Sequence, residues 1–154
     1  MSAFRLSDKE VAEARENRVP LSTKRHTLWS RNVYEQWAEA RNNEFHDFRQ
    51  ENEEFICVPS IEDTTVKELN YWLSKLALEV RKKDGGDYRH EVLYSLFCGL
   101  NRLSREKHPA LSLFHSPELK SFQQRFLLLM RMKCGNRGCY GHIVLTQLLT
   151  VSCF

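Results

Sequence analysis

Residues 65–103 read TVKELNYWLSKLALEVRKKDGGDYRHEVLYSLFCGLNRL, with apolar residues at helical spacing on both sides of a glycine pair. Thr65 and Glu68 have the spacing of a capping box, in which a hydroxyl and a carboxylate bind the first free N–H groups of a helix. Apolar residues then recur every three or four positions, as on one helix face. The stretch predicts one helix from 65 that stops at 84–86, where a glycine takes the C-cap conformation without strain. A second helix is predicted over about 89–106, and the two are expected to form a helical hairpin.

Helical patterns also flank this hairpin. Upstream of it, from Ser22, large apolar residues recur at helical spacing and predict a buried face made of Trp29, Val33, Trp37 and Ala40. Downstream of it, residues 116–118 (SPE) combine an N-cap hydroxyl, a proline at the first helical position and an acid, and so predict another helix that stops near Gly135. A weaker helix, capped by Ser7 and Glu10 and ending before Pro20, is expected to be a solvated arm.

Composition supports one all-α domain. The chain has 154 residues, 42% of them hydrophobic and 28% charged, with only 6 Gly and 4 Pro. We divide it into an N-terminal arm (1–21), a helical domain (22–133) and a divergent apolar tail (134–154). Residues 1–20 contain no apolar segment typical of a signal peptide, so we expect an intracellular protein. The apolar run at 143–151 in the tail is far shorter than the roughly 20 residues that span a bilayer.

Signatures of catalysis and metal binding are weak. No P-loop, dinucleotide fingerprint, G-x-S-x-G or H-E-x-x-H motif occurs. Cys134, Cys139 and His142, with Cys153, could be zinc ligands, but structural zinc sites normally have two close ligand pairs. Tyr140 lacks the several preorganised cations that phosphoryl transfer needs. We therefore predict no enzyme activity, no metal and no cofactor.

Charge is unevenly distributed, although the net charge is only +3. Residues 42–63 contain seven acids and one base, whereas residues 75–107 contain eight bases and five acids. Basic residues that could contact DNA phosphates occur at the start of the helix from 22 and at the ends of the hairpin helices. They are Lys24, Arg25, Arg31, Arg81, Lys82, Lys83, Arg89, Arg102 and Arg105. Helix capping and ordinary solvated helix faces are the alternative explanation of the same residues.

Four short runs of the hairpin region carry a resemblance to a known family: L-x-x-WL at 69–73, VRKKDGGDY at 80–88, LYSL at 93–96 and LNRL at 100–103. Over roughly Trp29 to Phe126 the chain resembles the tyrosine-recombinase-derived domain of Crypton elements, as found in MYM-type zinc-finger proteins and a glutamine-rich nuclear protein. The resemblance implies a SAM-like helical core, like the DNA-gripping part that precedes the recombinase catalytic domain. Residues 134–154 contain no His-x-x-Arg element, so Tyr140 is not expected to act as a nucleophile.

Pattern and resemblance together predict a five- or six-helix orthogonal bundle with a SAM-like core. Its expected function is a non-catalytic, nuclear, DNA-binding or chromatin-associated module, with double-stranded DNA as partner and nuclear proteins as further possible partners. No membrane and no small-molecule substrate is expected. The alternative is a protein-interaction adaptor that uses the acidic segment or the apolar tail without binding DNA.

We expect residues 134–154 to be dispensable for folding, because the helices predicted before Gly135 already supply leucine and aromatic faces for a core. A chain shortened after Lys133 should keep its cooperative thermal unfolding. Loss of that transition would show that the apolar run 143–151 belongs to the core. A chelator should leave the unfolding midpoint of the full chain unchanged, since a structural zinc ion contributes directly to folding free energy.

Overall fold

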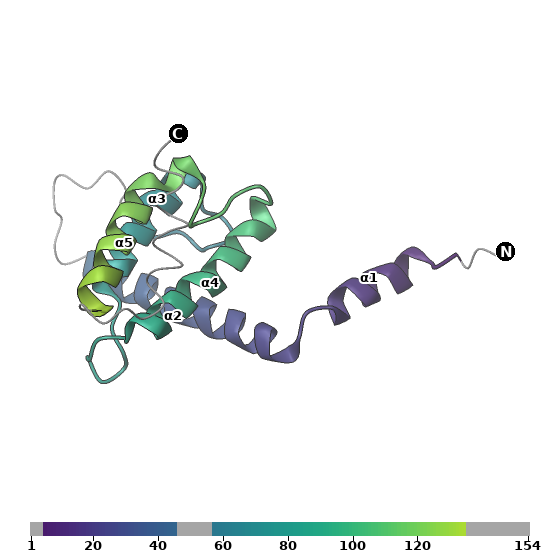
Figure 1. The fold of residues 1–154 in the computed structure, drawn as a ribbon, viewed down its shortest axis with the longest axis horizontal. Helices are drawn as coiled ribbons and strands as arrows, with labels where there is room; N and C mark the ends of the chain where they lie inside the picture. The colour runs from purple at the N-terminus through teal and green to yellow at the C-terminus, as the bar shows by residue number, and fades with distance from the viewer. Residues whose placement is uncertain (1–4, 46–56, 135–154) are drawn as a thin grey trace.

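A computed structural model describes residues 5–45 and 57–134 (Figure 1). This part of the chain consists of helices joined by turns and loops and contains no strand. The all-α prediction is therefore confirmed for this part of the chain. The elements in chain order are α1 (Asp8–Asn17), α2 (Leu21–Phe45), α3 (Val66–Glu79), α4 (His90–Lys107), the short 3-10 helix η1 (Pro117–Leu119) and α5 (Lys120–Cys134). None of these helices is long and apolar enough to cross a membrane.

The start of α3 is the capping box that the sequence predicted. The Glu68 N–H donates to Thr65 Oγ1 at 3.3 Å, and the Thr65 N–H donates to Glu68 Oε2 at 2.9 Å. Two backbone donors that the first helical turn leaves free are thus satisfied. From this start, α3 presents Leu69, Trp72 and Leu76 to the interior, each no more than 1% exposed.

The predicted end of α3 at the glycine pair is wrong. The helix ends at Glu79, and Val80 is extended with ψ 131° and only 5% exposed, because its side chain turns into the core. Gly85 does have a positive φ of 83°, but in a turn of the following loop, where its N–H donates to Lys82 O at 2.9 Å. Lys82 and Lys83 consequently lie in a loop and not in the last turn of a helix.

The predicted hairpin is also wrong in its pairing, although α4 has almost the predicted bounds. Helix α3 packs chiefly along α5, and α4 packs chiefly along α2. The loop 80–89 between α3 and α4 is long enough to let the two helices separate. Residues far apart in the chain therefore form the closest helix pairs.

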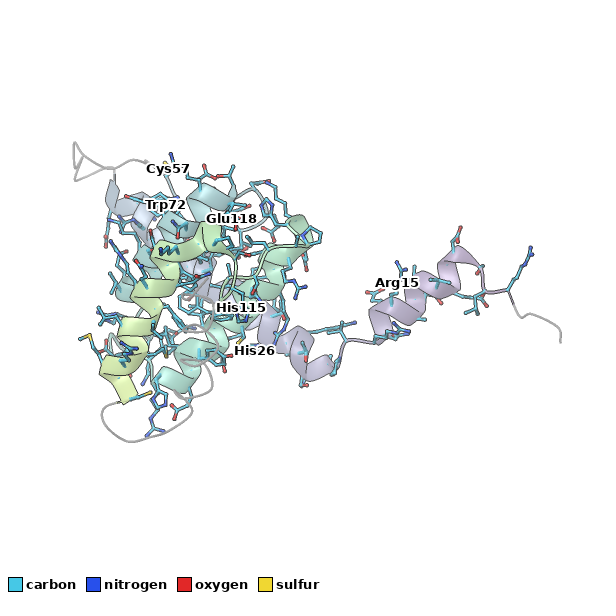
Figure 2. The ribbon with its side chains drawn as sticks, turned by 45° about the horizontal axis from the view of Figure 1, so that its top comes forward. Arg15, His26, Cys57, Trp72, His115 and Glu118 are labelled. Atoms are coloured by element: carbon cyan, nitrogen blue, oxygen red, sulfur yellow. The ribbon has the colours of Figure 1, made fainter. Side chains whose placement is uncertain are left out.

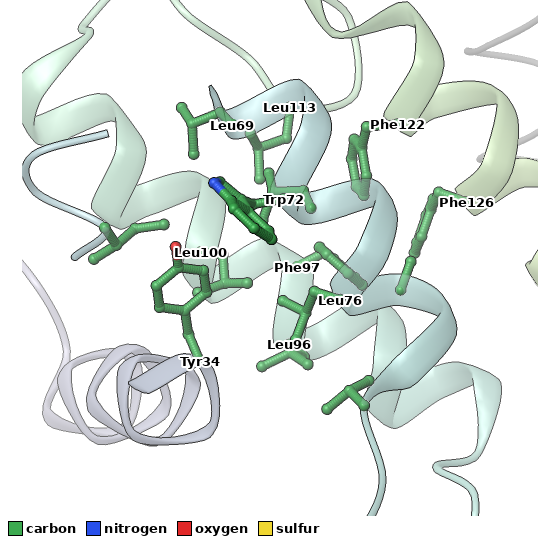
Figure 3. Packing of buried hydrophobic residues seen from close by; sticks show 14 of the residues in the cluster. Tyr34, Leu69, Trp72, Leu76, Leu96, Phe97, Leu100, Leu113, Phe122 and Phe126 are labelled. Carbon is green, nitrogen blue, oxygen red and sulfur yellow. The ribbon is translucent and has the colours of Figure 1, made fainter. Parts of the chain in front are cut away.

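The four long helices of the bundle share one core (Figure 3). Trp72 of α3 lies among Leu69, Leu76, Leu100 and Phe97, and α2 reaches the same cluster through Tyr34. Phe97 of α4 contacts Phe122 and Phe126 of α5 at ring-centroid distances of 5.0 and 5.1 Å. Burial of such large aromatic side chains is the dominant stabilising contribution in a domain of this size.

Helix α5 begins differently from the prediction. Residues 117–119 form a 3-10 turn, and the Ser116 hydroxyl accepts from the Ser112 N–H at 2.8 Å in place of capping a helix. A side chain of α3 takes over that role, since Asn70 Oδ1 accepts from the Phe122 N–H at 3.0 Å. The cap thus comes from a neighbouring helix, which sequence spacing alone cannot indicate. The predicted stop at Gly135 lies outside the described residues.

The buried face of α2 is rotated by one residue from the predicted face. Ser30, Tyr34 and Ala38 are no more than 8% exposed, whereas Trp29, Val33 and Trp37 are partly buried at the edge of the core and Ala40 is exposed. The reason is a close approach of α2 to α4. A Cβ added at Gly99 would lie 1.9 Å from Ser30 Oγ and 2.5 Å from Ser30 Cβ. The two helices can cross this closely only because both residues at the contact are small. Ser30 therefore occupies the centre of the interface.

Asn42 connects the end of α2 to the segment before α3. Its Nδ2 donates to Val58 O at 3.1 Å, and its Oδ1 accepts from the Val58 N–H at 2.8 Å. The Tyr34 hydroxyl donates to the next carbonyl, Pro59 O, at 2.9 Å. Three hydrogen bonds thus hold residues 58 and 59 against α2.

Helix α1 stands apart from the bundle (Figure 1). It buries no residue and is capped by its own Ser7 and Glu10, whose side chains and N–H groups form a second capping box. Arg15 on α1 lies far from the core residue Trp72 (Figure 2). The element has the position expected of a solvated arm.

Replacing Gly99 by Ala should destabilise the domain by about 1–3 kcal/mol, because the new methyl group overlaps Ser30. Ala is the better helix former by about 1 kcal/mol, so helix propensity alone predicts the opposite sign. Adding Ser30→Gly should recover part of the loss in a double-mutant cycle measured by urea unfolding. A Gly99→Ala variant as stable as the parent chain would contradict the close crossing of α2 and α4.

Candidate functional site

Of the nine cations predicted to bind a partner, Arg31 is engaged within the fold. Its Nη1 lies 2.5 Å from Glu62 Oε1, in the segment before α3. The partner is far away in the sequence and could not be identified from helical spacing. The positive charge of Arg31 is therefore compensated within the fold.

Arg81 is also engaged. Its Nη1 donates to Leu78 O at 3.0 Å and to Val80 O at 2.9 Å, and its Nε lies 3.0 Å from Asp87 Oδ1. The guanidinium thus satisfies carbonyl groups at the end of α3. Arg81 thus makes the contacts that the capping explanation expects.

Lys82, Lys83 and Arg89 are exposed in the loop between α3 and α4 and at the N-cap of α4. Within residues 5–45 and 57–134 their side chains make no hydrogen bond and no ion pair. Nearby Asp84 accepts from the Gly86 N–H at 2.8 Å, and Asp87 is paired with Arg81. The two lysines therefore have no direct acidic partner in the described part of the chain, and residues 81–89, with four bases and two acids, keep a net charge of +2.

The remaining candidates gather where the N-terminal turns of α2 meet the second half of α4. Arg102 Nη1 is 3.1 Å from His26 Nδ1 and donates to Thr27 Oγ1 at 3.0 Å. Lys24 and Arg25 lie just before His26 on α2, and Arg105 lies one turn after Arg102 on α4. We call Lys24, Arg25, Arg102 and Arg105 the α2–α4 corner; all four are exposed.

His26 holds the corner together in its neutral form. Burial lowers the pKa of His26, and the positive charge of Arg102 lowers it further. Neutral imidazole can accept the hydrogen bond from Arg102 at Nδ1, whereas protonated imidazole cannot. The ring also lies beside Trp29 in a tilted arrangement, with 5.6 Å between centroids. Arg102 is thus fixed in direction by α2.

Two side chains of the core region that could serve as nucleophiles, Cys98 and Tyr34, are poorly suited to that role. Burial raises the pKa of the Cys98 thiol, which disfavours the reactive thiolate. Burial also raises the pKa of Tyr34, whose hydroxyl already donates to Pro59 O. No group of three potential metal ligands occurs in the described part of the chain. The zinc candidates Cys139, His142 and Cys153, and Tyr140, lie outside it.

A groove that sequence analysis did not predict runs along α2. Its volume is about 540 Å³. One wall is the α2 stripe Trp29, Val33 and Trp37, and the other is the loop from Val80 to Tyr88. Hydrophobic spacing predicts the stripe but places it in the core. A second set of residues, Ser30, Tyr34 and Ala38, also repeats every four positions and forms the true core face. The small Ser30 in that set is the sequence signal that could have indicated a close helix crossing there.

The fold defines a small all-α domain with an exposed helical arm, a basic corner and a groove. This chain belongs to the QRICH1 domain family, that of glutamine-rich protein 1, whose family model matches residues 24–132. The match covers nearly all of α2 to α5 and confirms the resemblance to a domain of a glutamine-rich protein. The family is not a known catalytic one. No curated protein and no solved structure matches the chain.

Acidification should destabilise the fold through His26. Because its folded pKa lies below the ordinary value, its contribution to stability is complete above about pH 6.5 and is lost as the pH falls through the lowered pKa. His26→Gln keeps an acceptor for Arg102 but cannot be protonated. The unfolding midpoint of this variant should fall less between about pH 7.5 and 5.5 than that of the parent chain. Equal losses in both chains would exclude His26 as the acid-sensitive group.

Proposed function

We propose that this chain is a non-catalytic, DNA-binding domain that contacts the phosphate backbone through the α2–α4 corner. The proposal rests on which basic side chains have an acidic partner within the fold and which do not. Arg31 and Arg81 are neutralised by acids of the fold, whereas Lys24, Arg25 and Arg105 have no acidic partner among the described residues. Exposed cations concentrated on one part of a surface are the usual electrostatic feature of nucleic-acid binding.

Arg102 is suited to a phosphate contact. Only its Nη1 is used by His26 and Thr27, so Nη2 and Nε are left to donate outward. A guanidinium offers five donors in a rigid plane and can bind phosphate oxygens in pairs. Because α2 already orients this side chain, less conformational entropy is lost on binding than for a free arginine.

The wider parts of the proposal rest on the resemblance of residues 29–126 to recombinase-derived domains. They are a nuclear location, double-stranded DNA as the partner, descent from a tyrosine recombinase and a SAM-like core. Absence of catalysis is supported by the family assignment, by the burial of Tyr34 and by the raised pKa of the partly buried Cys98 thiol. A second set of predicted DNA contacts lies outside the α2–α4 corner and consists of Lys82, Lys83 and Arg89.

A salt titration of duplex-DNA binding tests the corner. The variant Lys24→Ala/Arg25→Ala/Arg105→Ala should bind unrelated duplexes more weakly to a similar degree. The slope of log K against log salt should become shallower by up to about 0.9 for each phosphate group that the variant no longer binds. The fold should survive, since exposed substitutions usually change stability by about 0.5 kcal/mol or less.

The matched control is Arg31→Gln/Glu62→Gln, which removes an internal ion pair and leaves the net charge unchanged. Its affinity and salt slope should equal those of the parent chain. An intact corner variant with undiminished affinity and slope would reject the corner as the DNA site. Absence of measurable DNA binding by the parent chain at low salt would reject the proposed function altogether and favour the adaptor.

A further inference from the structure

The groove is lined along α2 by apolar side chains that are not part of the fully buried core. Trp29, Val33 and Trp37 repeat every four residues, as core residues do, yet the core uses Ser30, Tyr34 and Ala38. The first three side chains keep one side against the core and the other toward the groove. A row of large apolar side chains that stay only partly buried, two of them tryptophans, is typical of surfaces that bind another chain.

Contacts on both sides hold this groove in shape. Trp37 Nε1 donates to Glu79 Oε2 of α3 at 3.1 Å, and Trp29 meets Tyr88 edge to face at a centroid distance of 6.4 Å. Lys133 Nζ of α5 donates to Tyr88 O at 2.9 Å. The opposite wall is closed by the turn in which the Lys82 N–H donates to Gly86 O at 2.9 Å. The groove therefore needs little reorganisation to accept a ligand.

The two lips of the groove differ in charge. The lip on α2 is neutral, with the amides of Asn32 and Gln36, whereas the lip on the loop carries Arg81, Lys82 and Lys83. Arg81 is compensated by Asp87, and the two lysines have no such partner in the described part of the chain. Among the described residues, none that lines the groove is acidic. An apolar floor with a basic lip is complementary to a segment that is apolar on one face and acidic on the other.

We propose that this groove binds an acidic amphipathic helix of a partner protein. The wall from Trp29 to Ala40 spans about three helical turns, or about 16 Å, which suits apolar anchors at positions i, i+3 or i+4, and i+7. Acidic residues beside those anchors meet Lys82 and Lys83. The DNA backbone does not explain the floor, because it offers no apolar surface to Trp29 and Val33. This inference does not depend on the α2–α4 corner, although it gives Lys82 and Lys83, also predicted DNA contacts, a second ligand.

The test uses the full chain and three labelled synthetic 16-residue peptides. The first has Leu at i, i+3, i+4 and i+7 with Glu on the other face, the second replaces each Glu by Lys, and the third scrambles the first. The first peptide should bind best in fluorescence anisotropy, and it should shift the indole N–H resonance of Trp29. Lys82→Glu/Lys83→Glu should weaken its binding about tenfold. The same variant should bind the lysine peptide better than the parent chain does.

The control Lys24→Glu/Arg25→Glu reverses the same number of charges at the α2–α4 corner and should leave the affinity for the acidic peptide within about twofold. This control should greatly weaken DNA binding, so the two sites are tested independently. Equal binding of the scrambled peptide, no preference for acid over lysine, or an unshifted Trp29 resonance would overturn the proposal. It would also be overturned if Val33→Glu abolished self-association of the chain, since a second copy would then be the occupant. Binding of the acidic peptide only after removal of residues 135–154 would assign the groove to the tail.

Discussion

The contact between Ser30 of α2 and Gly99 of α4 determines how the surface of this domain is arranged. The two helices approach so closely that neither position has room for a larger side chain. The crossing brings His26 and Thr27 within hydrogen-bond distance of Arg102, and so forms the basic corner. It also turns Trp29 and Val33 away from the centre of the core and toward the loop 80–88. One steric constraint thus produces both surface sites.

The helices of this domain could largely be predicted from the sequence, because helix starts depend on local chemistry. Thr65 with Glu68, and Ser7 with Glu10, are capping boxes that need only residues three positions apart. Arrangement could not be predicted in the same way. The rotation of α2 depends on Gly99, the cap of α5 depends on Asn70, and the end of α3 depends on burial of Val80. The first two features depend on contacts between residues that are distant in sequence, and the third depends on how a side chain packs in the core.

The candidate site shows the same division. The sequence identifies the basic residues only as a group, because charge counts treat Arg31 and Lys24 alike. The fold separates them, because Arg31 meets Glu62 while Lys24 is left in solvent. Likewise, Trp29, Val33 and Trp37 repeat at helical spacing as predicted, but they line the groove and not the centre of the core. Hydrophobic periodicity selects large apolar residues, whereas the helix crossing required a small residue, Ser30. Assignment to the QRICH1 domain family agrees with the four motif runs but adds no contact of this kind.

The clamp between Asn42 and Val58 has a consequence for how this chain can vary. One side-chain amide imitates a backbone partner, with both its groups bonded to residue 58, and Tyr34 secures residue 59. The end of α2 and the segment before α3 are thereby fixed at a constant separation. An aspartate at position 42 would still accept from the Val58 N–H but could not donate to Val58 O, so it would leave that carbonyl without its side-chain partner. Position 42 is therefore expected to vary little in size and chemistry during evolution, although its side chain is only partly buried.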